Sequence, residues 1–456
     1  MKRVTIIGTG YVGLVSGAGI SGFGHQVRCV DIDKQKIDLL NDGSIPIYEP
    51  ELKTLITRSV NAKRLTFSVA LEEAIKWAEV IFISVGTPQG ENGDADISAV
   101  ITVAEQIGIN LNNYKVICTK STVPIGSGKI IQKIIDQHNY DKVKYDYCSN
   151  PEFLREGAAV RDFLHPDRIV LGATSDKAFE YLNDVYRPLY INETPMVYTR
   201  VETAEMIKYA ANAFLAIKIS YINEIANLCD EIGADVHVVA KTLGTDGRIS
   251  PKFLHPGPGF GGSCFPKDTK ALVEIAKKYN IDMATVSAAI QTNIFQRKRM
   301  LNKLNDLLDN DLKGKIIAVL GLAFKQETDD VRESPAIEII TGIHDKGGII
   351  RAYDPIANDS MKEIFPALDF KSSWYKAVEG SDAAVIMTEW NEFRSMDLEK
   401  LKILMSQPVV LDTRNILNVS ELKRLEFKFD NCLLYTSPSP RDQRGSGMAG
   451  SGWKKK

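Results

Sequence analysis

Long apolar runs and an excess of one charge are both missing from this sequence of 456 residues. No apolar run reaches the roughly 18 residues that a helix needs to cross a bilayer, so a membrane-spanning protein is not expected. Basic and acidic residues number 56 and 58, and the formal net charge is -2. This balance gives no electrostatic reason to expect nucleic acid or a membrane surface as a partner. The length predicts about three domains of a soluble globular protein.

Cysteine is sparse and scattered, and no pair has CxxC spacing. The six cysteines stand at positions 29, 118, 148, 229, 264 and 432, with no histidine cluster beside them. This pattern does not fit a zinc site or a disulfide framework, so no metal is expected and the thiols are expected to be free. Met1–Arg3 leads straight into an apolar strand pattern, which does not fit a signal peptide. We therefore expect a cytoplasmic protein.

The first motif that is present joins a strand, a glycine-rich turn, a helix and a second strand. The β-branched run Val4–Ile7 ends at Gly8-Thr-Gly-Tyr-Val-Gly13, and an apolar helical pattern follows. The second strand, Val27–Val30, ends at Asp31. This order is the dinucleotide-binding fingerprint, in which the glycines admit the turn and the pyrophosphate. Asp31 would bind ribose hydroxyls and repel a 2′-phosphate, so NAD is expected rather than NADP.

Strand and helix patterns alternate in the first half of the chain and again in the last third. A second strand–turn–helix unit starts at Lys315–Gly321, and its next strand ends at Asp354. This unit lacks a GxGxxG pattern, so a second NAD is not expected there. The predicted fold class is α/β, with two doubly wound Rossmann-like domains joined by a long central helix.

The expected domains are 1–198 for NAD binding, 199–308 for a central helical part, and 309–433 for the second Rossmann-like domain. Residues 434–456 have the composition of a disordered segment or a sequence artefact, and we exclude them from the fold. The long helix is expected to start at a capping box, Thr199-Arg-Val-Glu202, and no glycine or proline interrupts it before Gly233. About 33 residues span on the order of 50 Å, which suits a strut between domains and a dimer surface.

Lys208 and Asn212 lie one turn apart on the apolar face of this helix. A lysine in such a place either extends to solvent or, together with the asparagine, donates hydrogen bonds to a developing oxyanion. Thr87 and Thr122 follow two predicted strands of the first domain, where they either end the strand or face a ligand.

The densest stretch is Phe253–Asp268, with four glycines and three prolines. Such a loop brings backbone close to a ligand. Cys264 stands just ahead of a helical pattern that has Pro266 in its first turn. The positive end of that helix and the neighbouring Lys267 favour a thiolate. The alternative is a tight turn around an inert, buried cysteine.

Acids and cations also gather in two other loops. Pro151 predicts a helical turn that places Glu152 and Glu156 on one face, although solvated surface acids are the alternative. Lys325 and Arg332 flank the start of a helix and suit a diphosphate, with a solvated loop as the alternative.

The sequence Gly259-Phe-Gly-Gly-Ser-Cys-Phe-Pro-Lys-Asp268 resembles the nucleophile loop of the UDP-glucose/GDP-mannose dehydrogenase family. The resemblance runs from Met1 to about Phe429. Enzymes of this family use NAD to oxidise a primary alcohol of a sugar nucleotide to a carboxylate. The GGSCFPKD form is most similar to members that use UDP-glucose.

The resemblance implies a role for each candidate residue. Catalysis falls to Cys264, Lys208, Asn212, Asp268, Thr122 and Glu152. Cofactor binding falls to Gly8, Gly10, Tyr11, Val12, Gly13, Asp31, Thr87, Thr122, Glu156 and Lys267. Substrate binding falls to Glu152, Phe153, Leu154, Arg155, Lys208, Asn212, Arg248, Phe253, Gly261, Lys325 and Arg332. Arg248 would reach the sugar nucleotide of the neighbouring subunit, so a homodimer would complete the site, and the second Rossmann-like domain would hold the UDP group.

The expected reaction is oxidation of UDP-glucose to UDP-glucuronate with two NAD and one water, through a thiohemiacetal and a thioester on Cys264. Three alternatives stay open. The same chemistry could act on UDP-N-acetylhexosamine or GDP-mannose. A two-electron hydroxyacid dehydrogenase would share the first domain but would not need Cys264. A nucleotide-binding regulator would need no catalysis.

Overall fold

A computed structural model describes residues 1–90 and 95–431, and the segment 434–456 set aside above lies outside this part. The first domain is built on an eight-stranded sheet of order β3-β2-β1-β4-β5-β6-β7-β8. Its strands are β1 (Arg3–Ile7), β2 (Gln26–Val30), β3 (Leu65–Ser68), β4 (Val80–Ile83), β5 (Lys115–Thr119), β6 (Tyr145–Ser149), β7 (Ile169–Ala173) and β8 (Met196–Thr199). All neighbouring strands are parallel except β6 and β7.

Helices cover both faces of this sheet, as a doubly wound fold requires. They are α1 (Tyr11–Gly22), α2 (Lys34–Asn41), α3 (Leu52–Asn61), α4 (Leu71–Trp77), α5 (Ser98–Asn110), α6 (Ser127–His138), α7 (Ala159–Leu164) and α8 (Asp176–Tyr186), followed by the 3-10 helix η1 (Arg187–Asn192). Strands β4, β5 and β7 are buried at every position. Strands enclosed on both faces read as continuous apolar runs, which is why the sequence pattern located them.

The second sheet has six strands, all parallel, in the order β11-β10-β9-β12-β13-β14. The strands are β9 (Ile316–Leu320), β10 (Ile349–Tyr353), β11 (Asp369–Phe370), β12 (Ala383–Ile386), β13 (Val409–Asp412) and β14 (Lys428–Asn431), with helices α13 (Pro335–Asp345), α14 (Asn358–Ile364), α15 (Trp374–Val378), α16 (Asn391–Arg394), α17 (Leu398–Leu404) and α18 (Val419–Arg424). Its order matches the Rossmann pattern, so the predicted fold class is confirmed.

The two sheets repeat one local device. Asp31, after β2, accepts the backbone N–H of Thr9 at 2.7 Å, and Asp354, after β10, accepts that of Leu322 at 2.7 Å. In each sheet the acid after the second strand therefore fixes the turn that follows the first strand. The repeat predicted from the sequence is present in the geometry of the turns as well as in the strand order.

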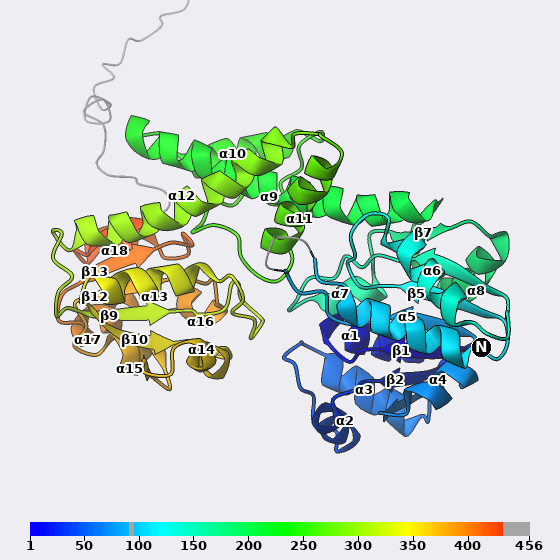
Figure 1. The fold of residues 1–456 in the computed structure, drawn as a ribbon. Coiled ribbons are helices and arrows are strands. Elements are labelled where there is room, and N and C mark those ends of the chain that lie inside the picture. The colour runs from blue at the N-terminus through cyan, green and yellow to red at the C-terminus, as the bar shows by residue number, and fades with distance from the viewer. Residues whose placement is uncertain (91–94, 432–456) are drawn as a thin grey trace, which may run out of the picture.

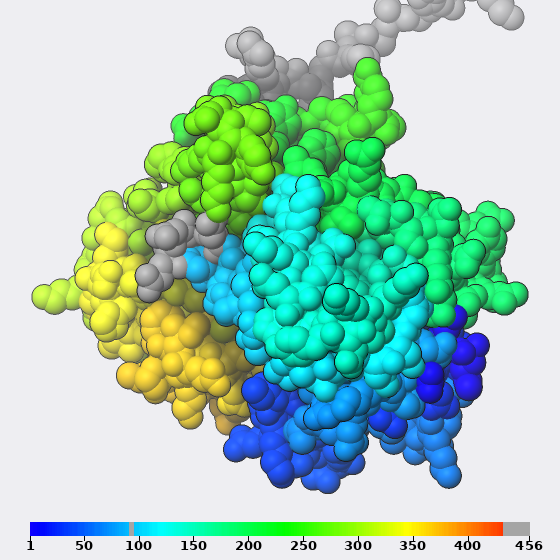
Figure 2. All heavy atoms as spheres, turned by 45° about the vertical axis from the view of Figure 1, so that its right-hand side comes forward, coloured from blue at the N-terminus to red at the C-terminus, as the bar shows by residue number. Residues whose placement is uncertain are grey.

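A layer of helices joins the two sheets. It contains α9 (Val201–Ile232), α10 (Val236–Thr245), α11 (Phe265–Lys278) and α12 (Ala284–Leu307). In Figure 1 α9, α10 and α12 run across the top of the molecule, above both lobes. Figure 2 shows the first lobe, blue to cyan, in front of the second lobe with the green helical layer above them.

Helix α9 has 32 residues and ends at Gly233, whose φ of 71° is left-handed. The predicted long helix is thus confirmed, but the predicted capping box is wrong. Arg200 occupies the N-cap position, and no side chain caps the helix there. Within residues 1–90 and 95–431, no helix is long and apolar enough to cross a bilayer.

Candidate active site

The glycine-rich turn between β1 and α1 has the shape that a dinucleotide needs. Gly8 has a φ of 101°, which disfavours any side chain. A Cβ on Gly13 would lie 1.9 Å from the carbonyl oxygen of Gly8, whereas a Cβ on Gly10 would meet nothing within 4 Å. Gly10 is also the N-cap of α1. The turn therefore leaves an open space at a helix N-terminus, which fits the pyrophosphate of NAD.

Asp31 lies at the edge of this space. Its Oδ2 accepts hydrogen bonds from the backbone N–H and the hydroxyl of Thr9, each at 2.7 Å. Burial raises the pKa of Asp31, but the hydrogen bonds from Thr9 and from the N–H of Asp33, together with the charge of Lys36, lower the net pKa. A carboxylate at this point suits ribose hydroxyls and disfavours a 2′-phosphate.

We expect Asp31→Asn to raise KM for NAD by about tenfold and to narrow the preference for NAD over NADP, because the charge that repels the phosphate is gone. The measurement is kcat/KM with each dinucleotide. Asp354→Asn is the matched control, since it alters the same device in the second sheet. If the ratio of kcat/KM with NAD to kcat/KM with NADP is the same in Asp31→Asn as in the wild type, Asp31 does not bind the ribose.

The predicted nucleophile stands at the start of α11. Cys264 is the N-cap residue, its carbonyl oxygen accepts the N–H of Asp268 at 2.8 Å, and its side chain is only partly buried. The loop before it is held from two helices. Asn223 of α9 accepts the N–H of Gly257 at 2.8 Å, and Asn293 of α12 accepts that of Phe260 at 2.7 Å.

Glycines let this loop pack closely against the second lobe. A Cβ on Gly261 would lie 2.3 Å from the carbonyl oxygen of Glu333, and one on Gly262 would lie 2.8 Å from the ring of Phe324. Phe253, at the start of the loop, has a φ of 65°, which is rare for a bulky residue. The glycines thus allow close packing against the second lobe, while the predicted close approach to a ligand stays a prediction.

Five charged or polar side chains gather beside Cys264. Lys208 Nζ donates to Glu152 Oε1 at 2.9 Å, and both side chains are buried. Asp268 accepts from Asn212 Nδ2 and from Lys267 Nζ, each at 2.6 Å. Residues far apart in sequence thus form one buried cluster of alternating charge, and Lys208 and Asn212 do not extend to solvent.

The expected thiolate at Cys264 is wrong for this state of the protein. Burial raises the pKa of Cys264 to about 11, although Lys208 acts in the opposite direction. Glu152 and Asp268 add to the rise because their negative charges oppose a second anion. The sequence pointed to Lys267 as the cation beside the sulfur, but Lys267 is bound to Asp268 and Lys208 takes that place. Burial works against the charge on Lys208, yet nearby carboxylates hold its pKa above the ordinary value.

The predicted helical turn at Pro151 is also wrong. Residues 151–155 are irregular, and the next helix, α7, begins only at Ala159. Glu152 turns inward because its two oxygens bind Lys208 and the N–H of Leu154. Glu156 takes a separate direction and accepts from Ser263 at 3.1 Å. The two acids therefore contact different parts of the site.

Glu156 and its neighbour Gly157 connect three parts of the molecule: the start of α1 after the glycine-rich turn, the loop before Cys264, and the second lobe. Its neighbour Gly157 donates to the hydroxyl of Tyr11 at 2.8 Å, while Ser263 lies next to Cys264. Lys325 Nζ donates to the carbonyl oxygen of Glu156 at 2.5 Å. Burial, followed by the nearby Asp330, raises the pKa of Glu156 to about 7. These contacts bring the predicted nucleophile to the same region as the glycine-rich turn.

The remaining residues predicted to bind substrate differ in their partners and in their exposure. Arg332 pairs with Asp330 at 2.8 Å and lies 3.6 Å from Glu156. Arg155 pairs with Asp162. The aromatic ring of Phe153 lies under Arg168 and Lys208. Arg248 is different, because its side chain is 89% exposed and pairs with Asp246, two positions before it.

Thr87, predicted to bind the cofactor, and Thr122, predicted to act on the attacking water, lie close to each other after two strands of the first sheet. The hydroxyl of Thr87 donates to the carbonyl oxygen of Thr122 at 2.8 Å. Just beyond, Glu205 of α9 accepts the N–H groups of Gly126 and Gly128 at 2.6 and 2.8 Å. The segment that carries Thr122 is therefore fixed to the central helix.

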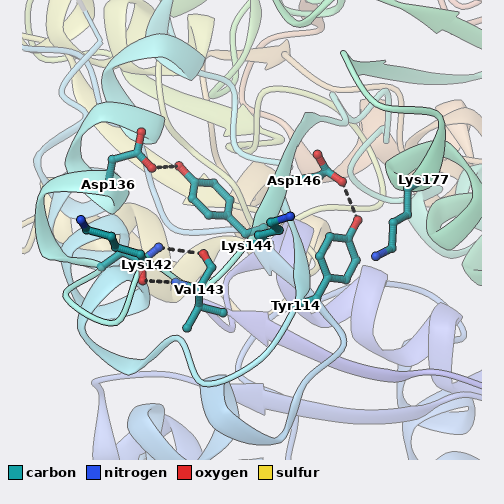
Figure 3. A pocket seen from close by; sticks show the side chains of 9 residues that line it. Tyr114, Asp136, Lys142, Val143, Lys144, Asp146 and Lys177 are labelled. Carbon is teal, nitrogen blue, oxygen red and sulfur yellow. Dashed lines mark hydrogen bonds between the residues drawn. The ribbon is translucent and has the colours of Figure 1, made fainter.

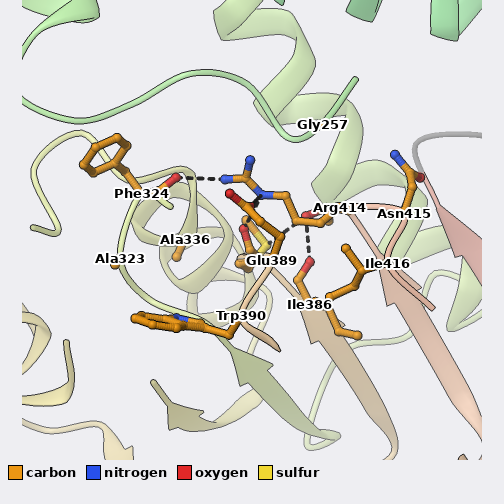
Figure 4. A network of polar contacts seen from close by, with 12 residues as sticks. Gly257, Ala323, Phe324, Ala336, Ile386, Glu389, Trp390, Arg414, Asn415 and Ile416 are labelled. Atoms are coloured by element: carbon orange, nitrogen blue, oxygen red, sulfur yellow. Dashed lines mark hydrogen bonds and ion pairs between the residues drawn. The ribbon is translucent and has the colours of Figure 1, made fainter. Parts of the chain in front are cut away.

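Sequence reasoning missed several supporting residues. Arg414, which follows β13, donates to the carbonyl oxygens of Met387 and Phe324 and pairs with Glu389 (Figure 4). It fixes the segment that carries Lys325. Asn223 and Glu205 were missed as well, because a buried polar side chain on a long amphipathic helix has no distinctive spacing. Lys120 is considered below.

A shallow hollow of about 560 Å³ lies elsewhere on the first lobe (Figure 3). It is lined by Tyr114, Asp136, Asn139, Lys142, Val143, Lys144, Tyr145, Asp146 and Lys177. Tyr114 precedes β5 and Val143–Asp146 lead into β6, so the hollow lies at the amino ends of these two strands. Ligands of doubly wound sheets bind at the opposite, carboxyl ends, where Thr122 and Glu152 lie.

The two Rossmann sheets, the NAD cradle and the buried cluster around a cysteine define an NAD-dependent dehydrogenase. Three models of the UDP-glucose/GDP-mannose dehydrogenase family match this chain: the NAD binding domain over residues 2–190, the central domain over 202–294 and the UDP binding domain over 318–419. The chain belongs to that family.

Named relatives cover nearly the whole chain. It is 46% identical over 430 residues to a UDP-glucose 6-dehydrogenase of Rhizobium meliloti, covering 94% of this chain and 98% of that one. It is also 46% identical to the UDP-glucose 6-dehydrogenase TuaD of Bacillus subtilis, covering 93% and 91%. Among solved structures, the UDP-glucose dehydrogenase of Pyrobaculum islandicum has a TM-score of 0.86 at 33% identity and covers 91% of this chain and 95% of that one.

Proposed function

We propose that the protein oxidises UDP-glucose to UDP-glucuronate in two NAD-dependent steps, with one water consumed. The observation that carries the proposal is the buried cluster of Lys208, Asn212, Asp268 and Glu152 beside a partly exposed Cys264. A simple two-electron dehydrogenase would have no use for that cysteine. Curated relatives at 40–46% identity carry the name UDP-glucose 6-dehydrogenase, which favours this sugar nucleotide over the others.

The residues of the chain divide the work. NAD supplies a two-electron acceptor for each oxidation when it is bound at the turn Gly8–Gly13, with Val12, Thr87 and Lys267 as further contacts. Lys325 and Arg332 bind the diphosphate. Residues 153–155 and Phe253 surround the sugar, and Gly261 lets backbone approach it. We keep the domain boundaries 1–198, 199–308 and 309–433 as part of the proposal.

The first oxidation removes a hydride from C6 and releases the proton of its hydroxyl to solvent. It leaves an aldehyde at C6, which Cys264 then attacks. A bond forms between Sγ and C6, and the thiol proton moves to the aldehyde oxygen, so no free thiolate is required in the balance. Lys208 and Asn212 donate hydrogen bonds to that oxygen while its charge develops. The second oxidation converts the resulting thiohemiacetal into a thioester.

Hydrolysis of the thioester completes the reaction. Asp268, with help from Thr122 and Glu152, takes a proton from water as the water attacks C6. The C6–sulfur bond breaks, Cys264 regains its proton and UDP-glucuronate leaves. The net change consumes two NAD and one water for each sugar.

Counting NADH per sugar tests the proposal. Purified protein is supplied with limiting UDP-glucose, UDP-N-acetylglucosamine, UDP-N-acetylmannosamine or GDP-mannose, and NADH is measured at completion. We expect two NADH per UDP-glucose and a kcat/KM for UDP-glucose at least about tenfold above the others. One NADH would indicate a simple alcohol dehydrogenase, and none with any sugar would indicate a non-catalytic protein.

The proposal includes a cytoplasmic homodimer formed through the helical layer. Apolar side chains stand exposed there, including Phe214 at 62%, Leu228 at 56% and Phe295 at 65%. Apolar groups of this size gathered on one layer mark an interaction surface. Free cysteines among the described residues fit a reducing compartment.

Mixing two inactive variants should restore activity if Arg248 serves the partner's site. In a hybrid of Cys264→Ser and Arg248→Ala subunits, one site has both an intact cysteine and an intact arginine. Random mixing makes half of the dimers hybrid, so about a quarter of wild-type activity is expected after unfolding and refolding the two variants together. Each variant refolded alone is the control. No recovery in the mixture would show that Arg248 acts within its own subunit, and an active Arg248→Ala control would show that it has no role.

A further inference from the structure

A second buried lysine stands behind the cluster and has no role in the mechanism above. Lys120 follows β5 and is 5% exposed. Its Nζ donates to Asn150 Oδ1 at 3.2 Å and to the hydroxyl of Tyr186 at 3.5 Å, and no carboxylate of residues 1–90 and 95–431 lies within 4 Å of it. The partners of this ammonium group are all neutral: two oxygens at long distances and the ring of Tyr186, whose centroid lies 5.9 Å away. A charge bonded in this way is costly to bury.

A lysine at the opposite end of β5 shows how a buried lysine is bonded where its role is structural. Lys115, at the amino end of β5, is fully buried and donates to the carbonyl oxygens of Lys76 and Ala78 and to Asn113 Oδ1, at 3.2, 2.7 and 2.7 Å. Three acceptors match its three N–H groups. Lys120 has fewer and weaker bonds, so packing alone does not explain its charge.

The surroundings of Lys120 lead directly to the site. Asn150, which it contacts, is also bound by the hydroxyl of Tyr186 at 2.6 Å, and its own Nδ2 donates to the carbonyl oxygen of Val170. Two residues further on is Glu152. Among the charged groups near Lys120, Glu152 favours its charge and Lys208 opposes it. Burial lowers the pKa of Lys120 to about 8.

We propose that Lys120 is a positioning residue for Glu152: through Asn150 it holds the turn that aims this carboxylate, and it supplies positive charge behind it. The inference rests on the proposed function. In the structure the charge of Glu152 is balanced by its ion pair with Lys208. In the proposed mechanism Lys208 must also donate a hydrogen bond to the oxyanion at C6. When Lys208 is drawn to the substrate, Lys120 compensates the negative charge of Glu152, so that Glu152 keeps its place for the water that cleaves the thioester.

The test compares Lys120→Met with Lys115→Met, the same substitution at the two ends of β5. We expect Lys120→Met to lower kcat by about 10- to 100-fold, the usual effect of a misplaced group, with KM for UDP-glucose within about threefold of wild type. Its Tm should be unchanged or higher, because a poorly bonded buried charge has been removed. The covalent sugar–enzyme adduct should accumulate in intact-protein mass spectra. Lys115→Met should lower Tm and leave kcat unchanged.

Tyr186→Phe is the second variant, since it removes one hydrogen bond to Asn150 without removing charge. A kcat reduced by about three- to tenfold is expected. The proposal is overturned if Lys120→Met keeps wild-type kcat, or if Lys120→Met and Lys115→Met lose activity and stability alike. If Lys120→Met does not fold, an unchanged kcat in Tyr186→Phe overturns it. If wild-type protein makes no NADH with UDP-glucose, the proposed function fails, and the comparison is made with the sugar nucleotide that is oxidised.

Discussion

Replacing Cys264 by serine should reduce formation of UDP-glucuronate by at least about 10³-fold, because the hydroxyl is a far weaker nucleophile toward the aldehyde than the thiol. The first oxidation does not use the sulfur, so a single turnover should still yield about one NADH per site. The substitution also changes little else, since serine keeps the size of the side chain at the N-cap of α11 and favours that position. The measurements are NADH in a single turnover and product by chromatography.

Cys229→Ala is the matched control for this experiment. Cys229 is a buried cysteine near the end of α9, in an apolar cluster with Val236 and Leu254. We expect it to lower stability slightly while kcat stays at the wild-type value. A Cys264→Ser variant that makes two NADH per sugar at the normal rate would remove the nucleophile from the mechanism.

The pKa of Cys264 determines how fast the thiol reacts with an alkylating reagent at a given pH. Because burial raises that pKa to about 11, the free enzyme holds a thiol at neutral pH. Labelling of the free protein by iodoacetamide should therefore be slow at pH 7 and accelerate as pH rises through 8 and 9, since the thiolate is the species that reacts. Rapid labelling at pH 7, independent of pH, would show that the site ionises the sulfur before substrate binds.

The parts of this site that could be predicted are those set by local sequence. The turn Gly8–Gly13, the long helix before Gly233 and the position of Cys264 at a helix start each follow from residues a few places apart. The second Rossmann-like sheet followed from its own strand and turn patterns, although its turn has no GxGxxG. Local rules suffice there because glycine, proline and apolar spacing act on the backbone of their own segment.

The parts that could not be predicted depend on burial and on contacts between distant segments. The local sequence predicts that Glu152 lies in a helical turn or on the surface. Instead its side chain is buried and pairs with Lys208, 56 positions away. The same distance in sequence separates Asn212 from Asp268. The charge state of Cys264 was mispredicted for a related reason: a cation nearby favours a thiolate, but enclosure among two carboxylates reverses the balance.

Lys208→Met should produce the other large loss, a fall in kcat of about 10²- to 10³-fold, since it removes a donor to the oxyanion at C6. The same substitution leaves the carboxylate of Glu152 buried without its cation, so a stability loss of about 3 kcal/mol is expected as well. Both effects should be measured, by steady-state kinetics and by urea unfolding.

Lys241→Met provides the control, because Lys241 is an exposed lysine on the neighbouring helix α10. It should change neither quantity. The double variant Lys208→Met with Glu152→Gln separates the two roles of Lys208. Removing the unpaired charge should restore most of the lost stability, while kcat stays low because the oxyanion donor is still absent. Recovery of kcat in the double variant would mean that Lys208 serves only to neutralise Glu152, and the oxyanion would then need another donor.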